Sequence, residues 1–280
     1  MVKFIADIGS NHNQNLDRCL ELIDRAIEIG CWGVKFQLFR ASSLHAQAQA
    51  EVKKQELPRG YIQHLSEYCS RSNINFGVTP FDIKSAEFLE GKVGFVKVSS
   101  FDILRLDLIE TVAKLGVPVI ISTGMATRGE VDDAERAVFK AGNQDLTFLH
   151  CVSRYPAHPE DCDLGQITFL SLSHPLCGVG WSDHTVHPAV IYRAEFNGAE
   201  VIEFHLDLDG KGAEYQHRHC WLPQQMAPVI SGVRTARRAN LPNDTHPITE
   251  EERLQRADPS DGLRPMQEAR VQTIVDRRKA

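Results

Sequence analysis

The sequence has no long hydrophobic run, no closely spaced pair of cysteines and no excess of positive charge. A membrane helix needs roughly 18 uninterrupted apolar residues, and no stretch of these 280 residues approaches that length. The 31 Lys and Arg are outnumbered by 37 Asp and Glu, and the net charge of −6 argues against a nucleic-acid surface. We therefore expect a protein that binds neither membranes nor nucleic acid.

The seven cysteines are scattered and contain no CxxC pair, which indicates neither a disulfide framework nor a four-thiolate zinc site. The N-terminal run MVKFIADIGSNH is too short in its apolar part for a signal peptide and lacks a small-residue cleavage site. It is typical of a first β-strand. With 42% hydrophobic and 24% charged residues, the composition is that of an ordinary globular protein. Together these features favour a cytoplasmic location.

Short β-rich runs alternate with longer helical patterns from the first residue to about residue 240. Strict alternation implies parallel strands with right-handed crossovers, and eight such repeats predict a closed (β/α)8 TIM barrel, an α/β fold. The alternative is an open, doubly wound sheet, which the absence of a GxGxxG turn after the first strand disfavours. The predicted strands are Val2–Ile8, Gly33–Leu38, Ile74–Thr79, Phe95–Ser99, Pro118–Thr123, Leu146–Val152, Cys177–Trp181 and Val201–Leu206.

Composition divides the chain into two regions. Residues 1–240 contain no linker and are predicted to form one TIM-barrel domain of catalytic size. Residues 241–280 are rich in proline and charge, which predicts a C-terminal extension with a short helix from Met266 to the end. The helical patterns of the first region include Asn15–Ile29, Gly129–Lys140 and His187–Phe196, and the glycines predicted to cap helix ends are Gly30, Gly116, Gly142 and Gly198.

The predicted strand ends carry polar side chains, and a parallel barrel places its functional groups there. Lys35 and Lys97 each interrupt an apolar strand, and an ammonium group facing the barrel interior needs an anionic partner. That partner is either an internal carboxylate, such as Asp7 or Glu203, or a small phosphorylated or carboxylated ligand. A ligand is favoured by the hydroxyl groups at neighbouring strand ends, those of Thr79, Ser100, Ser122 and Ser182.

Two histidines, His184 and His205, end the seventh and eighth predicted strands. Adjacent strands lie about 4.8 Å apart, so the two imidazoles can share one cation. Two neutral imidazoles without a thiolate suit an exchangeable octahedral ion such as Mn2+, with Mg2+ or Co2+ as alternatives, better than structural zinc. The HxHC run of His217, His219 and Cys220 is a weaker signal for zinc.

Eight short motifs occur in order at the predicted strand ends: ADIGSNH, VKFQ, TPFD, KVSS, STGM, HCVSRYP, GWSDHT and EFH. With them, the chain resembles the sialic acid synthase family of phosphoenolpyruvate-dependent sugar-acid synthases over about residues 4–210. The resemblance implies a metal-dependent condensation of phosphoenolpyruvate with an aldose such as N-acetylmannosamine. The products would be a 2-keto-3-deoxy sugar acid and phosphate.

The resemblance also implies roles for individual residues. It implies phosphoenolpyruvate binding by Lys35, Thr79, Lys97, Ser100, Ser153 and Ser182, and metal binding by His184 and His205. On the sugar side we expect Gln37, Tyr155, Glu214 and His217, with further contacts from Tyr215 and His219. A carboxylate must accept the proton of the water that adds to C2 of phosphoenolpyruvate, and the candidates are Asp7, Asp102 and Glu214.

The sequence also departs from the family pattern. Asp7 and Asp102 stand where the family usually has Glu, and Ser153 replaces an expected Asn. The segment KGAEYQHRHCWLP replaces a Gly-Pro-Asp segment, which puts Glu214 where a sugar-binding Asp is expected. The family's C-terminal antifreeze-like domain, which reaches across a dimer, has no counterpart in the sequence. We therefore expect the protein to act on an aldose other than N-acetylmannosamine, or to bind that sugar differently. We also expect a homodimer.

Two other functions are compatible with the residues. In the first, Lys97 or Lys35 forms a Schiff base with a keto acid, in a metal-free aldolase or lyase. The pair of histidines and the presence of a second lysine argue against it. In the second, the protein is a non-catalytic homologue that keeps the anion pocket, a hypothesis motivated by the two shortened carboxylates and the absent domain.

Overall fold

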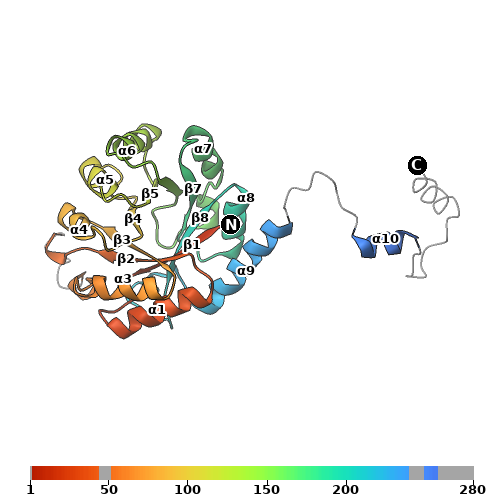
Figure 1. The fold of residues 1–280 in the computed structure, drawn as a ribbon, viewed down its shortest axis with the longest axis horizontal. Helices are drawn as coiled ribbons and strands as arrows, with labels where there is room; N and C mark the ends of the chain where they lie inside the picture. Colours follow the sequence, from red (N-terminus) through yellow and green to blue (C-terminus); the bar gives the residue numbers. More distant parts are fainter. Residues whose placement is uncertain (1, 44–51, 240–248, 258–280) are drawn as a thin grey trace. The chain divides into compact units, whose positions relative to one another are not determined.

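The computed structural model describes residues 2–43, 52–239 and 249–257 (Figure 1). The chain divides into two compact units, Met1–Arg237 and Arg238–Ala280. In the second unit, helix α10 spans Glu250–Ala257, in a stretch for which the sequence predicts no helix. The short helix predicted from Met266 lies outside the described residues.

In the first unit, parallel strands of the described residues pair in chain order, and β1 also pairs with β8, which closes the sheet into a barrel (Figure 1). This confirms the predicted TIM barrel. Two strands have the predicted bounds, and the other six differ by one or two residues at an end. The strands are β1 Lys3–Gly9, β2 Gly33–Leu38, β3 Asn75–Pro80, β4 Phe95–Val98, β5 Val119–Ser122, β6 Leu146–His150, β7 Gly178–Asp183 and β8 Val201–Leu206.

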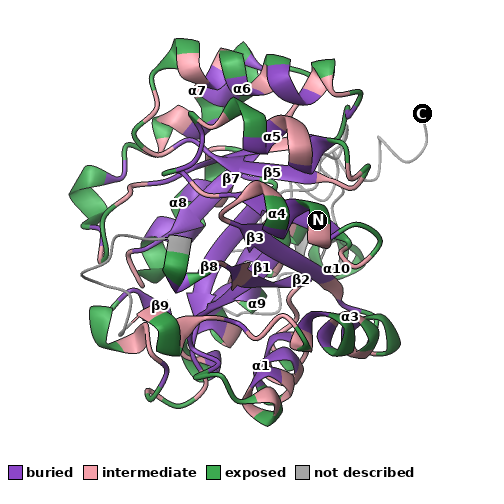
Figure 2. Ribbon diagram, turned by 90° about the vertical axis from the view of Figure 1, so that its left-hand side faces the viewer, coloured by how far each residue is buried: buried purple, intermediate pink, exposed green. Residues whose placement is uncertain are grey.

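Helices surround the barrel, and their buried faces form its outer core with the strands (Figure 2). The four glycines predicted to cap helices all have positive φ. Among the described residues, no helix combines the length and the apolar character that crossing a membrane requires. The helices of this layer are α1 Leu16–Glu28, α3 Tyr61–Arg71, α4 Ile83–Phe88, α5 Leu106–Ala113, α6 Arg128–Lys140, α7 Gly165–Ser173, α8 Pro188–Phe196 and α9 Pro223–Ala239.

The barrel interior is layered, because alternate residues of a strand face the same side. A lower layer is apolar and forms a small core of its own, with Ile5, Phe95, Ile120, Leu149 and Val201. Two residues further along the same five strands, toward their carboxyl ends, the side chains change character. These positions hold Asp7, Lys97, Ser122, Cys151 and Glu203, all buried. The apolar layer is therefore the floor on which a polar layer stands.

Gly180 on β7 is needed because the barrel interior leaves no room for a side chain there. A Cβ at this position would overlap the backbone oxygen of Val201 and lie 2.7 Å from Leu149 Cδ2. We expect Gly180→Ala to lower the free energy of unfolding by about 2–3 kcal/mol, since backbone cannot move aside as a side chain can. Urea unfolding followed by circular dichroism measures it. Gly129→Ala is the control, because no atom lies within 4 Å of its Cβ, and an unchanged midpoint for Gly180→Ala would contradict the prediction.

The chain between β8 and α9 folds back against the ends of β8 and β1. A short strand, β9 Cys220–Trp221, extends the sheet beside β8, with Cys220 opposite His205. The buried Asn11 amide donates to the Leu206 carbonyl at 3.0 Å, and its oxygen accepts from the backbone N–H of Glu214 at 2.8 Å. Glu214 and Cys220 are thereby held at the mouth of the barrel.

Candidate active site

A cavity of about 420 Å3 opens at the carboxyl ends of the strands, above the polar layer of the barrel. Its lining brings together residues from most of the strands and from the segment after β8. Most predicted site residues belong to this lining. They are Asp7, Lys35, Gln37, Thr79, Lys97, Ser100, Tyr155, Ser182, His184, His205, Glu214 and His217.

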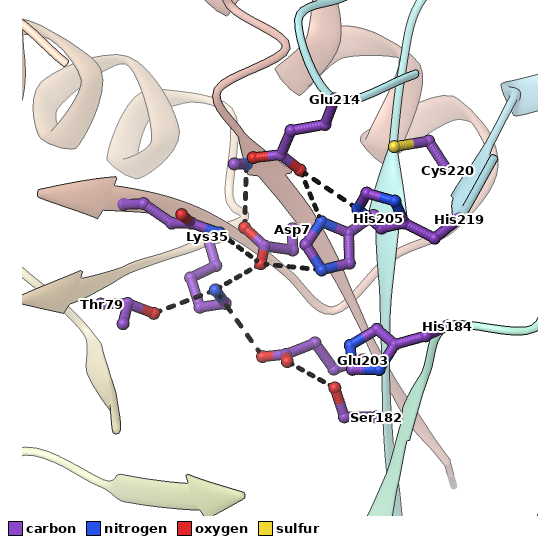
Figure 3. A network of polar contacts seen from close by, with 12 residues as sticks. Asp7, Lys35, Thr79, Ser182, His184, Glu203, His205, Glu214, His219 and Cys220 are labelled. Atoms are coloured by element: carbon purple, nitrogen blue, oxygen red, sulfur yellow. Dashed lines mark hydrogen bonds and ion pairs between the residues drawn. The ribbon is translucent and has the colours of Figure 1, made fainter. Parts of the chain in front are cut away.

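Two buried lysines at the floor of the cavity are each paired with a carboxylate. Figure 3 shows the pair of Lys35 and Asp7. Lys35 Nζ lies 2.6 Å from Asp7 Oδ2 and donates to Thr79 Oγ1 at 3.0 Å. Lys97 Nζ lies 3.2 Å from Glu203 Oε1. Burial alone would raise the pKa of Glu203, but Lys97 and Lys35 outweigh it and lower that pKa. Both internal carboxylates considered as partners of the lysines are therefore present.

Hydroxyl groups lie on the same wall of the cavity as the lysines. Ser182 donates to Glu203 Oε1 at 2.9 Å, and the Ser100 and Ser153 hydroxyls lie 2.9 Å apart. The buried Ser122 Oγ and Glu203 Oε2 have no hydrogen-bond partner among the described residues. Unpaired buried polar atoms are costly, so these two are available to a polar ligand.

His184 and His205 lie side by side, with ring centroids 5.5 Å apart. His184 Nδ1 lies 2.7 Å from the Val152 carbonyl oxygen, which can only accept. The proton of the neutral ring is therefore on Nδ1, and Nε2 keeps its lone pair. Burial lowers the pKa of His184 to about 3, which maintains this neutral form.

His205 is held between two carboxylates (Figure 3). Its Nδ1 lies 2.8 Å from Glu214 Oε2, and its Nε2 lies 3.7 Å from Asp7 Oδ2. Burial alone would lower the pKa of His205, but Asp7 and Glu214 outweigh it and raise that pKa. A carboxylate that accepts from one nitrogen of an imidazole and leaves the other free is the usual partner of a metal-ligating histidine.

The outer part of the cavity is lined by aromatic rings. Tyr155 stacks near His184, with centroids 4.2 Å apart, and its ring edge faces His219 at 4.9 Å. His217 lies beyond His219, at 6.2 Å. Of these rings, Tyr155 and His217 are exposed and His184 and His219 are buried. Polar rings at a cavity mouth can contact both the hydroxyl groups and the C–H faces of a sugar.

Two predicted site residues are not in the lining. Asp102 lies beside Arg105, whose Nη1 is 3.3 Å from its carboxylate. Burial raises the pKa of Asp102. Ser153 is set back behind Ser100, with which it shares a hydrogen bond. The structure thus brings Asp7 and Glu214 into the cavity, and it places the third candidate base outside it.

Three residues in or beside the cavity were given too small a role on the basis of the sequence alone. Glu203 was considered only as a structural partner of the lysines, although it stands two residues before His205 and shares its inward face. His219 was predicted as a sugar contact and, with Cys220, as part of a weak zinc signal. Both lie beside His205 and Glu214, and donor atoms of these four residues are all within 4.8 Å of one another. His217, of the same HxHC run, is not in that group.

Comparison with known proteins agrees with this geometry. The NeuB family model matches residues 22–242. The chain belongs to the NeuB family. This confirms the resemblance drawn from the motifs and the assignment of the chain to the sialic acid synthase class of phosphoenolpyruvate-dependent sugar-acid synthases.

Relatives in this family carry names of sugar-acid and polysaccharide biosynthesis. The chain is 31% identical over 265 residues to the spore coat polysaccharide biosynthesis protein SpsE of Bacillus subtilis, covering 89% of this chain and 71% of that protein. It is 33% identical over 255 residues to the N,N'-diacetyllegionaminic acid synthase of Campylobacter jejuni, covering 84% and 76%. A solved N-acetylneuraminic acid synthetase from Leptospira borgpetersenii, in complex with citrate, superposes with a TM-score of 0.82 at 28% identity, covering 94% and 93%.

Proposed function

We propose that this NeuB-family enzyme condenses phosphoenolpyruvate with an aldose in a reaction that requires a divalent cation. The observation that carries the proposal is the arrangement of two buried lysine–carboxylate pairs, unpaired oxygens and two adjacent histidines around one cavity. C3 of the enol would attack the sugar aldehyde, and water would add at C2. The C2–O bond would then break and release phosphate, leaving a 2-keto-3-deoxy sugar acid.

The charges of the cavity support the need for a cation. Lys35 and Lys97 face three carboxylates, on Asp7, Glu203 and Glu214. Phosphoenolpyruvate brings about two to three further negative charges at neutral pH. Even with His205 protonated, the sum is negative in a low-dielectric site, where uncompensated charge is costly. A divalent cation offsets much of this charge.

The residues present fit such a cation at His184 and His205. Both rings have Nδ1 engaged by a protein acceptor, Val152 O and Glu214 Oε2, so both Nε2 atoms are available. Imidazole nitrogens with further positions for oxygen ligands suit Mn2+, and also Mg2+ or Co2+. A cation bound there would polarise the aldehyde of the sugar.

The side chains of the enzyme then have distinct tasks. Lys35 and Lys97, with the Thr79, Ser100 and Ser182 hydroxyls, would bind the phosphate and carboxylate groups. Asp7 is favoured over Asp102 as the acceptor of the water proton, because it lines the cavity. Gln37, which donates to Asp7 at 3.2 Å, would lie on the sugar side with Tyr155, Glu214 and His217. The homodimer, the cytoplasmic location and the identity of the aldose stay predictions.

The direct test is phosphate release from phosphoenolpyruvate with Mn2+, across hexoses, pentoses and their N-acetyl derivatives, with products identified by mass spectrometry. Release that depends on one aldose, with a product heavier than that aldose by the mass of one pyruvic acid, would support the proposal. Tight binding of phosphoenolpyruvate without release on the whole panel would favour the non-catalytic homologue. A borohydride-trapped adduct on Lys35 or Lys97 would favour the Schiff-base lyase.

His217 is expected to contribute to sugar binding and not to phosphoenolpyruvate binding. Its side chain is exposed at the mouth of the cavity, and its ring centroid lies 6.2 Å from that of His219. We expect His217→Ala to raise the KM for the aldose about tenfold, the value of one hydrogen bond lost from a partly desolvated site. The KM for phosphoenolpyruvate should stay unchanged. Steady-state kinetics with each substrate varied in turn measures both, and equal changes in the two KM values would contradict the assignment.

A further inference from the structure

Four metal-binding side chains, one on β8 and three from the segment that follows it, come together on the Nδ1 side of His205. These groups belong to His205, Glu214, His219 and Cys220, and their donor atoms all lie within 4.8 Å of one another. We propose that they form a second cation site, for a divalent ion of the zinc class that accepts a thiolate. The proposal goes beyond the synthase reaction and does not depend on it.

The four groups converge because two structural features position them. Cys220 pairs in register with His205 on the neighbouring strand, so the thiol and the imidazole share one end of the sheet. Glu214 Oε2 lies between two rings, 2.8 Å from His205 Nδ1 and 3.6 Å from His219 Nε2 (Figure 3). The four residues are thus brought together by the turn of the segment between β8 and β9 and by the pairing of these two strands.

Buried groups around the cluster hold this arrangement. Asn11 Nδ2 donates to Cys220 Sγ at 3.4 Å, while the same side chain accepts from the Glu214 backbone. The backbone N–H of Ser10 donates to Glu214 Oε1 at 2.6 Å. Second-layer hydrogen bonds of this kind orient metal ligands, and an N–H directed at sulfur stabilises a thiolate.

Strand β9 is anchored from its other side. The Trp221 indole N–H donates to Asp183 Oδ2 at 2.9 Å, and both residues are buried. Gly212 permits the tight path of the segment, because a Cβ there would overlap the side chains of Asn11 and Asp207. A segment built with this much buried polar structure positions its donors precisely enough to select a ligand geometry.

The buried ring of His219 presents Nε2 to the cluster. His219 is 4% exposed, and its Nε2 lies 3.6 Å from Glu214 Oε2, just beyond hydrogen-bond distance. The other ring nitrogen, Nδ1, has no hydrogen-bond partner among the described residues. A cation held by the cluster would engage Nε2.

The chemistry of the donors indicates which cation would bind. A thiolate, two imidazoles and one carboxylate provide four protein ligands, which is the number and type typical of tetrahedral Zn2+ and its substitute Co2+. Mn2+ and Mg2+ prefer oxygen donors. Binding would displace the thiol proton of Cys220 and the Nδ1 proton of His205, and both would leave to the buffer.

The second site need not compete with the cation proposed for the reaction. The two nitrogens of His205 point in different directions, Nδ1 toward Glu214 and Nε2 toward Asp7. An imidazole that has lost both protons can bridge two ions. The bridged arrangement would couple the 207–221 segment, at the sugar side of the cavity, to the ion beside His184.

The experiment uses the full chain, stripped with a chelator and reloaded with Co2+, whose complexes with thiolates show a near-ultraviolet charge-transfer band. We expect the wild-type protein to show the band and Cys220→Ser to lose it. His219→Gln should weaken the binding of Co2+ about tenfold or more, because even the loss of a residue that only orients a metal ligand lowers metal affinity by about that factor. His184→Ala should keep the band, because His184 is not one of the four donors.

Two controls separate the site from general effects. Cys31→Ser removes a half-buried thiol outside the cluster, and the band should remain. Thermal melting of the apo proteins shows whether Cys220→Ser still folds, and metal analysis of the protein as purified gives its content of zinc. The proposal is wrong if wild type shows no band, if Cys220→Ser retains it, or if His184→Ala abolishes it. Failure of phosphate release leaves all of these measurements interpretable, so the two proposals are tested separately.

Discussion

Replacing Lys97 by methionine is expected to abolish detectable binding and turnover of phosphoenolpyruvate. Methionine has a similar length and removes only the ammonium group. Lys97 is buried and its Nζ lies 3.2 Å from Glu203 Oε1. Without it, Glu203 keeps only the more distant Lys35, at 3.9 Å, and the cavity floor is more negative toward an incoming anion. Truncating one partner of a buried charge pair in a binding interface costs about 2–5 kcal/mol of binding free energy, so the affinity for phosphoenolpyruvate should fall by about a hundredfold.

Isothermal titration calorimetry with phosphoenolpyruvate measures this effect. Part of the loss could come from a destabilised fold, because Glu203 would be left buried with its charge. The double variant Lys97→Met/Glu203→Gln removes that charge, and we expect it to recover thermal stability without recovering phosphoenolpyruvate affinity. Lys92→Met, at an outer loop position, is the matched control and should bind normally. Full activity of Lys97→Met would refute the binding role of this lysine.

The barrel and much of its site follow from local sequence patterns. Four of the five strands in the apolar floor change from apolar to polar over two residues, as in the step from Ile5 to Asp7 or from Phe95 to Lys97. Because alternate residues face the same side, this step marks the level at which the apolar floor of a barrel ends. Applied to Val201, the same rule identifies Glu203 as an inward, functional-level residue, which the interpretation of Glu203 as a structural partner alone overlooked.

The segment after β8 could not be predicted in the same way. Its path depends on long-range contacts, from Glu214 to Ser10 and Asn11 and from Trp221 to Asp183. Strand and helix patterns repeat every two or 3.6 residues, so they reveal only neighbours along one element and not these contacts between distant residues. The HxHC run therefore looked like a weak zinc motif, whereas the fold adds His205 and Glu214 to two of its members and leaves His217 outside.

Asp102 shows the opposite case, in which the fold does not bring a motif position into the cavity lining. The sequence matches the family at KVSS, and Asp102 follows two residues after this motif, so it was assigned to catalysis. In the fold, the loop after β4 turns the carboxylate toward Arg105, with which it makes an i,i+3 pair. The turn is local, but its direction depends on Arg105 also donating to the Phe81 carbonyl at 2.7 Å in the neighbouring loop.

Removing the divalent cation is expected to stop turnover, and Mn2+ is expected to restore it in wild type but not in His205→Ala. His205 joins the two halves of the site: it is opposite Asp7 in the strand register, beside His184 and bonded to Glu214. Alanine there removes one of the two Nε2 donors and frees Glu214 from its partner. A bound cation contributes several kcal/mol to the polarisation of a carbonyl, so the rate should fall by at least about a thousandfold.

The measurement combines phosphate release with metal content after dialysis, at Mn2+ concentrations that saturate the wild-type enzyme. His187→Ala is the matched control, because this exposed histidine lies three residues from His184 and outside the cavity lining. A wild-type rate and metal content in His205→Ala would show that the cation is not held there. Loss of the rate with full metal content would instead mean that His205 acts on the substrates directly, since its Nε2 also faces Asp7, the favoured acceptor of the water proton.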